Sequence, residues 1–187
     1  MKTPSVKKLY SEKSIPALKK ELGIKNVMAL PRIAKVVVNV GIGKILKDQK
    51  RVDEVVASLE RITGQKVLLT KARKAIAGFK IREDLEIGAR VTLHGQRMWD
   101  FLDRLFMIAL PRVRDFQGIR TKAVDHSGNL NLGIKDHTIF SEIVPEKVQH
   151  VFSFQVNVVT TSKNEAEGRV LFRSLGLPFE QSDSNDK

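Results

Sequence analysis

Alternating and β-branched apolar runs predict the strands of this chain. Residues 33–40 (IAKVVVNV) are rich in valine and isoleucine and are followed by Gly41-Ile42-Gly43. Residues 66–70 and 87–94 form a second and a third run, and residues 152–158 form another. Successive side chains of a strand point to opposite faces of a sheet. The first run therefore puts Ala34, Val36, Val38 and Val40 on one face, and Ile33, Lys35, Val37 and Asn39 on the other.

Apolar residues at helical spacing predict helices between these strands. Residues 48–62 carry a single apolar stripe that ends before Gly64, a residue suited to a helix C-terminus. Residues 97–110 give a strongly apolar helical pattern directly after the third strand. We expect Pro111 to stop this helix, because proline lacks the N–H of the helical hydrogen bond.

Two further helices are predicted near the ends of the chain. Thr3-Pro4 suits the start of a helix over residues 4–22. Ser14 followed by Pro16 repeats this start signal, which allows a break there. Ser162 and Glu165 match a capping box, in which the side chain of each residue accepts a hydrogen bond from the backbone N–H of the other. A last helix is therefore expected after the final strand.

The order of these elements predicts an α+β fold. Strand, helix, two strands, helix, insertion and strand is the split βαβ (ferredoxin- or RRM-like) pattern, an antiparallel sheet with helices on one face. We expect residues 1–179 to form one domain, with a long basic loop at 71–86 and an insertion at 111–151 that holds one or two short strands. Residues 180–187 are too polar to pack and are expected to be disordered.

The face of the sheet away from the helices is expected to stay open. It would carry the following cations and hydrogen-bonding side chains: Lys35, Asn39, Lys66, Thr70, Arg90, Thr92, His94, Gln155 and Asn157. Such a face suits RNA, but it lacks the aromatic residues on which splayed bases stack, so phosphate, ribose and base-edge contacts to a folded RNA fit better. An ordinary solvated sheet face is the alternative.

Charge sharpens this interpretation. The formal net charge is +12, and residues 1–95 hold 21 Lys+Arg against 9 Asp+Glu, whereas residues 96–187 hold 12 of each. The excess therefore lies in one half of the chain, which indicates a side that faces a polyanion. There is no cysteine, no apolar stretch of membrane-spanning length and no signal-peptide pattern, so a cytoplasmic protein without membrane association is expected.

The basic loop concentrates this charge. Residues 71–82 contain five cations and no acid, and like charges this close repel one another, so we expect the loop to stand off the body. Residues 75–79 (AIAGF) interrupt the cations with a small apolar patch that can pack or stack. The sequence thus predicts a nucleic-acid-contacting loop carried by two strands.

Catalytic and cofactor motifs are weak in this chain, and we expect no enzyme, no cofactor and no metal. The segment from Gly41 to Lys44 (GIGK) lacks the spacing of a phosphate loop. Asp125-His126 and Asp136-His137 are adjacent pairs, and neighbouring residues on a strand do not face each other. Two other hypotheses stay open: a regulatory module that binds an acidic protein partner, and a small RNA-modifying enzyme.

Four long blocks resemble one protein family. They are LPRIAKVVVNVGIG (30–43), GQKVLLTKARKAIAGFKIRE (64–83), FLDRLFMIALPRVRDFQGI (101–119) and GNLNLGIKDHTIFSEI (128–143). Together they are similar, in order and separation, to the fifth protein of the bacterial large ribosomal subunit, a family that binds 5S rRNA. The resemblance extends from about residue 16 to residue 179.

The resemblance implies roles for particular residues. By similarity, the principal polar contacts to 5S rRNA are Asn39, Gln65 and Thr92, supported by Arg32, Lys35, Lys66 and Arg90. The basic loop matches the segment that reaches toward the P-site tRNA, with the contact residues Lys71, Arg73, Lys74, Phe79, Lys80 and Arg82. The family also implies attachment of 5S rRNA in the central protuberance, contact with 23S rRNA and neighbouring proteins, and a bridge to a protein of the small-subunit head. The chain would act as a monomer within the ribosome.

Overall fold

The computed structural model describes residues 5–46, 48–114, 116–144, 146 and 148–180. Its centre is a five-stranded antiparallel sheet in the order β2-β3-β1-β5-β4. The strands are β1 (Ile33–Gly41), β2 (Leu68–Lys71), β3 (Glu86–Leu93), β4 (Leu130–Ile134) and β5 (Phe154–Thr160). The order β2-β3-β1-β5 is that of the split βαβ fold, and β4 is added beside β5. The predicted α+β class is confirmed.

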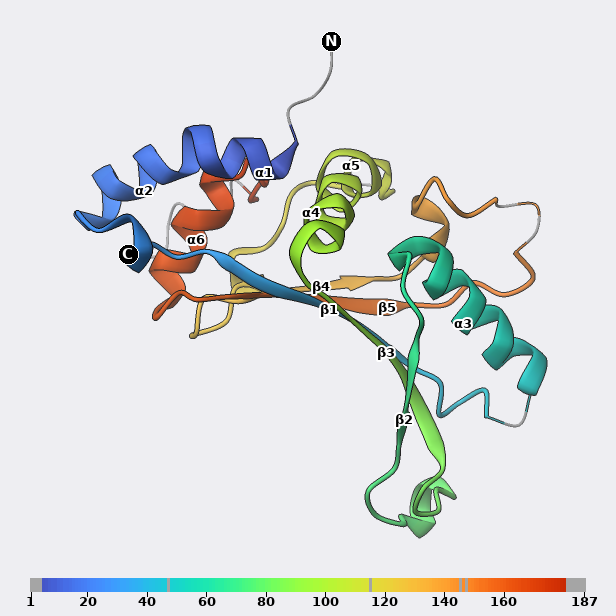
Figure 1. Cartoon of the computed structure of the whole chain (residues 1–187). Helices are drawn as coiled ribbons and strands as arrows, with labels where there is room; N and C mark the ends of the chain where they lie inside the picture. Colours follow the sequence, from blue (N-terminus) through green and yellow to red (C-terminus); the bar gives the residue numbers. More distant parts are fainter. Residues whose placement is uncertain (1–4, 47, 115, 145, 147, 181–187) are drawn as a thin grey trace.

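The helices cover one side of this sheet (Figure 1). They are α1 (Val6–Leu9), α2 (Ile15–Leu22), α3 (Gln49–Thr63), α4 (Gly95–Arg104), α5 (Leu110–Arg112) and α6 (Glu165–Ser174). Single 3₁₀ turns occupy Val27–Ala29, Ala77–Phe79, Thr121–Ala123 and His137–Ile139. No helix in the described ranges is both long enough and apolar enough to cross a membrane.

The core lies between the helices and the inner face of the sheet. Val36 and Val38 of β1 are fully buried there, together with Phe101 of α4 and Phe172 of α6. The ring of Phe101 stacks on the buried ring of Phe140 with 5.9 Å between centroids. Burying an apolar side chain of this size contributes roughly 1.5–3 kcal/mol, so this layer fixes which face of the sheet is left for other contacts.

Helix α3 follows its sequence pattern closely. Val52, Val55, Leu59 and Ile62 form its buried stripe. The Asp48 carboxylate accepts the Arg51 N–H at the start of the helix, and Gly64 ends it with φ 65°. That backbone conformation favours glycine, as the prediction requires.

The helix-start signal repeated at Ser14 and Pro16 is confirmed, because Ser14 is the N-cap of α2 and Pro16 lies in its first turn. The π turn Tyr10–Ser14 joins α1 to α2 at this point. Pro111 does not stop the helix after α4, since another π turn, Leu105–Ala109, leads into α5 and puts Pro111 in its first turn. The first turn of a helix tolerates proline, whose missing N–H has no helical partner there. Thr3-Pro4 lies outside the described residues.

Helix α6 does not begin with the predicted capping box. Its N-cap is Asn164, and Ser162 makes no cap. The Ser162 hydroxyl instead accepts a hydrogen bond from Thr160 at 3.0 Å, which ties it to the end of β5. The Glu167 carboxylate accepts the Lys163 N–H at 2.9 Å and so satisfies a backbone donor before the helix.

The start of β1 departs from simple alternation. Pairing with β5 shifts between Ile33 and Lys35, which places an irregularity at Ala34. Ile33 is therefore buried and Ala34 is exposed, the reverse of the faces predicted for these two residues. A bulge of this kind inserts a residue into one strand, and the alternation resumes after it.

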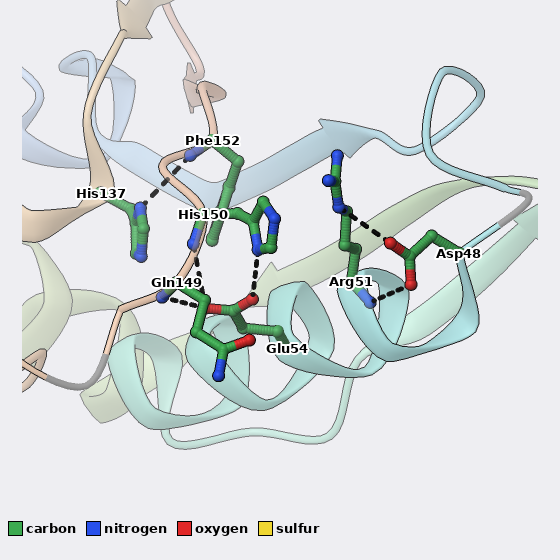
Figure 2. A network of polar contacts seen from close by, with 7 residues as sticks. All are labelled: Asp48, Arg51, Glu54, His137, Gln149, His150 and Phe152. Carbon is green, nitrogen blue, oxygen red and sulfur yellow. Dashed lines mark hydrogen bonds and ion pairs between the residues drawn. The ribbon is translucent and has the colours of Figure 1, made fainter.

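The predicted insertion packs against the fold over part of its length. The carboxylate of Glu54 on α3 accepts the N–H groups of Gln149 and His150 at 2.9 and 3.4 Å, and it lies 3.2 Å from His150 Nδ1 (Figure 2). Burial raises the pKa of Glu54, but these hydrogen bonds outweigh it and lower the pKa overall. We call this contact the Glu54 clamp. It holds the approach to β5 against α3.

The buried ring of His137 lies close to this clamp. It stacks on Phe152 with 4.0 Å between ring centroids, and its Nδ1 lies 3.5 Å from the Phe152 N–H (Figure 2). Burial lowers the pKa of His137, so the neutral ring is favoured.

The first residue of the predicted disordered tail, Glu180, is bound to the fold, because its N–H donates to the Ile119 carbonyl at 3.1 Å. The rest of the predicted disordered tail, 181–187, lies outside the described residues.

Candidate nucleic-acid interface

The open side of the sheet carries a polar surface. Along β1, β3 and β5 the buried residues alternate with residues exposed on the side that the helices leave uncovered (Figure 1). The alternation that turns Val36, Val38 and Val40 inward turns Val37 and Asn39 outward. We call this surface the open face. It begins where the bulge at Ala34 ends.

Strand pairing aligns its residues into rows. Arg90 lies opposite Asn39 and also opposite Leu68, while Gln155 lies opposite Asn39 and opposite Gly133. Residues directly opposite in antiparallel strands share a face, so these side chains form one row across all five strands. A second row contains Thr92, Val37, Asn157 and Asn131.

The structure therefore brings three predicted contact residues together. Asn39 and Arg90 are neighbours in the first row, and Thr92 follows Arg90 by two residues on the same face. Asn39 and Arg90 are exposed, and Thr92 is half-buried. An amide, a guanidinium and a hydroxyl can thus contact one ligand at the same time.

Gln65 takes a different position. It precedes β2, and its side-chain amide donates to the backbone carbonyl of Thr92 at 3.1 Å. Gln65 therefore fixes the end of β3 as well as standing beside the open face. Lys66, the next residue, is exposed.

The remaining predicted cations lie toward the start of β1. Lys35 is half-buried and follows the bulge, whereas Arg32 precedes the strand and is exposed. The Arg32 backbone is tied to Thr161, because its N–H donates to the Thr161 hydroxyl at 3.0 Å and its carbonyl accepts the Thr161 N–H at 2.9 Å. The Arg32 side chain thus starts from a backbone fixed at the edge of the interface.

The basic loop forms the end of a hairpin. Ala72 N–H donates to the Leu85 carbonyl at 2.8 Å, and Ile76 and Ile81 exchange hydrogen bonds at 2.9 and 3.2 Å. The hairpin projects beyond the body of the fold (Figure 1). All its predicted contact residues are exposed: Lys71, Arg73, Lys74, Phe79, Lys80 and Arg82. Phe79 is 74% exposed at the tip.

The hairpin tip and the open face are separate surfaces. Within the described part of the chain, none of the five hairpin cations forms an ion pair. They are therefore available to phosphate groups. They lie at the end of β2 and in the loop between β2 and β3, whereas Asn39 and Thr92 lie within β1 and β3 in the sheet. The two predicted sets of site residues do not form one site.

Sequence reasoning missed several residues of the open face. Leu68 is 66% exposed beside Arg90, although a leucine in a strand is expected to face the core. Asn131 and Gly133 belong to β4, whose place at the sheet edge was not predicted. The alternation of Leu130, Leu132 and Ile134 was the available signal, since it implies that the residues between them face outward.

The two Asp-His pairs have structural partners. Asp125 accepts hydrogen bonds from its own turn, including the Asn129 and Ser127 N–H groups at 2.8 and 3.0 Å. Burial raises the pKa of Asp125, but these bonds outweigh it and lower the pKa. Asp136 accepts the Thr138 N–H at 2.8 Å. Among the described residues, no three His, Cys, Asp or Glu side chains are grouped so that they could hold a metal.

Comparison with known proteins gives concordant matches. The family model described as ribosomal protein L5 matches residues 26–82, and the model for the C-terminus of the same ribosomal protein family matches residues 86–179. A large ribosomal subunit protein uL5 from Kocuria rhizophila is 47% identical over 177 residues, which cover 95% of this chain and 94% of that protein. The two matched segments meet within the hairpin that carries the basic tip.

Proposed function

Since the chain belongs to the ribosomal protein L5 family and is a constituent of the large ribosomal subunit, we propose that its open face binds 5S rRNA. One observation carries the proposal. Arg90, Asn39 and Thr92 lie side by side on a sheet surface that none of the described helices covers. A guanidinium suits phosphate groups, and amide and hydroxyl groups suit ribose and base edges.

Charge supports a nucleic acid as the ligand of this face. The predicted cations on this face and at its edge are Arg32, Lys35, Lys66 and Arg90, and they come from the half of the chain that holds the whole net positive charge. Cations supply affinity through phosphate contacts, whereas the amides fix the register of the protein on the RNA. The exposed Leu68 adds an apolar contact beside Arg90.

The hairpin has a second role in this proposal. Its exposed cations and the exposed ring of Phe79 contact the P-site tRNA, at a distance from the surface that holds 5S rRNA. The family resemblance supports the further parts of the proposal: attachment of 5S rRNA in the central protuberance beside 23S rRNA, and a bridge to a protein of the small-subunit head. This role is structural and requires no catalysis.

Binding of the purified chain to 5S rRNA tests the proposal. We expect tighter binding to 5S rRNA than to an unrelated folded RNA of equal length, and we expect Arg90→Ala to weaken it. Lys80→Ala, which removes a cation at the hairpin tip, is the matched control and should leave 5S rRNA binding unchanged. Equal affinity for the two RNAs would contradict the proposal.

A pull-down distinguishes an RNA ligand from an acidic protein partner. The tagged chain is captured from a lysate with and without ribonuclease. We expect ribonuclease to release the bound partners, because RNA joins them to the chain. A single acidic protein that stays bound after digestion would favour the regulatory module instead.

A further inference from the structure

A hollow of about 480 Å³ opens on the open face beside Asn39. It lies over three neighbouring strands and is lined by Asn39 and Gly41 of β1, Ser153 and Gln155 at β5, and Gly133 and Lys135 at β4. These residues include four polar side chains and no acid. The hollow is shallow and open to solvent, so it can hold one side of a group of nucleotide size without enclosing it.

Two glycines create the hollow. Asn39, Gln155 and Gly133 are opposite one another in the first row of the open face, so Gly133 leaves a gap where that row would carry a side chain. Gly41 leaves a second gap two residues beyond Asn39. A Cβ added to either glycine would meet nothing within 4 Å. The backbone of β1 and β4 is therefore bare at the floor.

The rim offers hydrogen bonds that the protein does not use. The side-chain amides of Asn39 and Gln155 are exposed, and neither has a hydrogen-bond partner in the described ranges. Each amide presents a donor and an acceptor, the combination that pairs with the edge of a base. Lys135 is exposed at the rim and supplies a positive charge for a phosphate group.

We propose that this hollow seats one unpaired nucleotide of the bound RNA. Asn39 and Gln155 hydrogen-bond the edge of its base above the Gly133 backbone, and Lys135 neutralises its phosphate. No exposed aromatic ring lines the hollow, since the side chain of Phe154 is 4% exposed. Recognition is therefore through the edge of the base and not through stacking. This inference rests on the proposed binding of 5S rRNA by the open face.

Filling the hollow tests the inference. Gly133→Val places a branched side chain on the floor, where its Cβ would meet nothing within 4 Å, and β-branched residues suit strands. We expect the affinity for 5S rRNA to fall roughly tenfold, the effect of losing a paired base edge. Gly78→Val is the matched control, because Gly78 also has open space around it but lies at the hairpin tip. The thermal unfolding of both variants should show that the fold is kept.

Chemical probing of the RNA supplies a second measurement. We expect the wild-type chain to protect one unpaired base of 5S rRNA, and both Gly133→Val and Gln155→Ala to expose that base. Gln155→Ala removes an exposed amide, so it tests the inference even if Gly133→Val does not fold.

Two results would overturn the inference in different ways. Wild-type affinity and unchanged protection in Gly133→Val and Gln155→Ala, with Arg90→Ala still weakening binding, would remove the nucleotide site and leave the proposed function intact. Absence of 5S rRNA binding by the wild-type chain would remove both.

Discussion

Single polar residues give the open face its chemistry. Asn39 interrupts a strand of valines, where asparagine is disfavoured, and its exposed amide has no partner in the described part of the chain. It therefore adds nothing visible to the stability of the sheet. The Thr92 hydroxyl is also available to a ligand, because Gln65 donates to the backbone carbonyl of Thr92 and not to its side chain.

Removing these side chains should affect binding and spare folding. We expect Asn39→Ala and Thr92→Ala each to weaken 5S rRNA binding about fivefold, the effect of losing one hydrogen bond of about 1 kcal/mol. A filter-binding titration measures the affinity, and denaturant unfolding checks the fold. Lys19→Ala, on the helical side, is the control. Unchanged affinity in both variants would remove these residues from the interface.

His137 should make stability depend on pH. Burial lowers its pKa below the ordinary value of 6.5, so the unfolded chain binds a proton more readily than the folded chain. The free energy of unfolding should therefore decrease as the pH falls through about 6.5. His137→Phe, which keeps a ring against Phe152, should remove this decrease, whereas the exposed His126→Gln should not. Denaturant titrations at pH 7.5 and 5.5 measure the difference.

Glu54 acts in a more acidic range. Its pKa is lowered from 4.5 in the folded chain, so the stability it contributes is present above that value and is lost as the pH falls further. A loss near pH 6.5 that persists in His137→Phe would assign that window to another group.

At the scale of elements, hydrophobic periodicity was informative where the packing is regular. It predicted α3, its Gly64 end and the four strands of the split βαβ sheet. It failed at Ile33 and Ala34, because a bulge changes the face without changing the composition. It also failed at Pro111, because the π turn Leu105–Ala109 that leads into α5 cannot be read from residue types.

The end of α3 offers a test of backbone conformation. Gly64 has φ 65° and no atom within 4 Å of an added Cβ, so Gly64→Ala carries a conformational cost and no steric clash. We expect the free energy of unfolding to fall by about 1 kcal/mol. Gly43→Ala, also in open space but without a positive φ, should be close to neutral. Equal effects of the two substitutions in denaturant unfolding would contradict this explanation.

The hairpin should be separable from the open face. We expect the triple variant Lys71→Ala, Arg73→Ala and Lys74→Ala to bind 5S rRNA like the wild type, because these cations lie outside the open face. In assembled ribosomes the same variant should bind P-site tRNA more weakly. A triple variant of Lys13, Lys19 and Lys20 on the first helices controls for lost charge. Collapse of 5S rRNA binding would show that the hairpin belongs to that interface.

At the scale of the whole molecule, charge and topology act together. The sequence predicted a polar open face and a basic projection, and the structure keeps them apart. It could not predict that β4 extends the sheet beyond β5, because that contact depends on how residues 111–151 pack. For Gln65 the sequence indicated only a contact with RNA. Its hydrogen bond to the Thr92 carbonyl depends on the tertiary fold and could not be predicted.

Salt dependence should separate the two kinds of contact. With Arg32, Lys35, Lys66, Arg90 and Lys135 on or beside the open face, the logarithm of 5S rRNA affinity should fall against the logarithm of salt concentration with a slope of about −4. Arg90→Ala should reduce the slope by about one, whereas Asn39→Ala should lower the affinity at every salt concentration and keep the slope. Titrations from roughly 50 to 300 mM salt, a range that includes physiological ionic strength, measure the affinity and the slope. An equal slope for wild type and Arg90→Ala would mean that Arg90 meets no phosphate.

Strand β3 has a mechanical consequence. It starts in the hairpin and continues through Arg90 and Thr92; its first half pairs with β2 and its second half with β1. If the open face binds 5S rRNA as proposed, the hairpin is an arm whose base is fixed by that RNA. A shift of the RNA would then move Phe79 at the tip by a larger distance, so binding at the sheet would set how far the hairpin reaches.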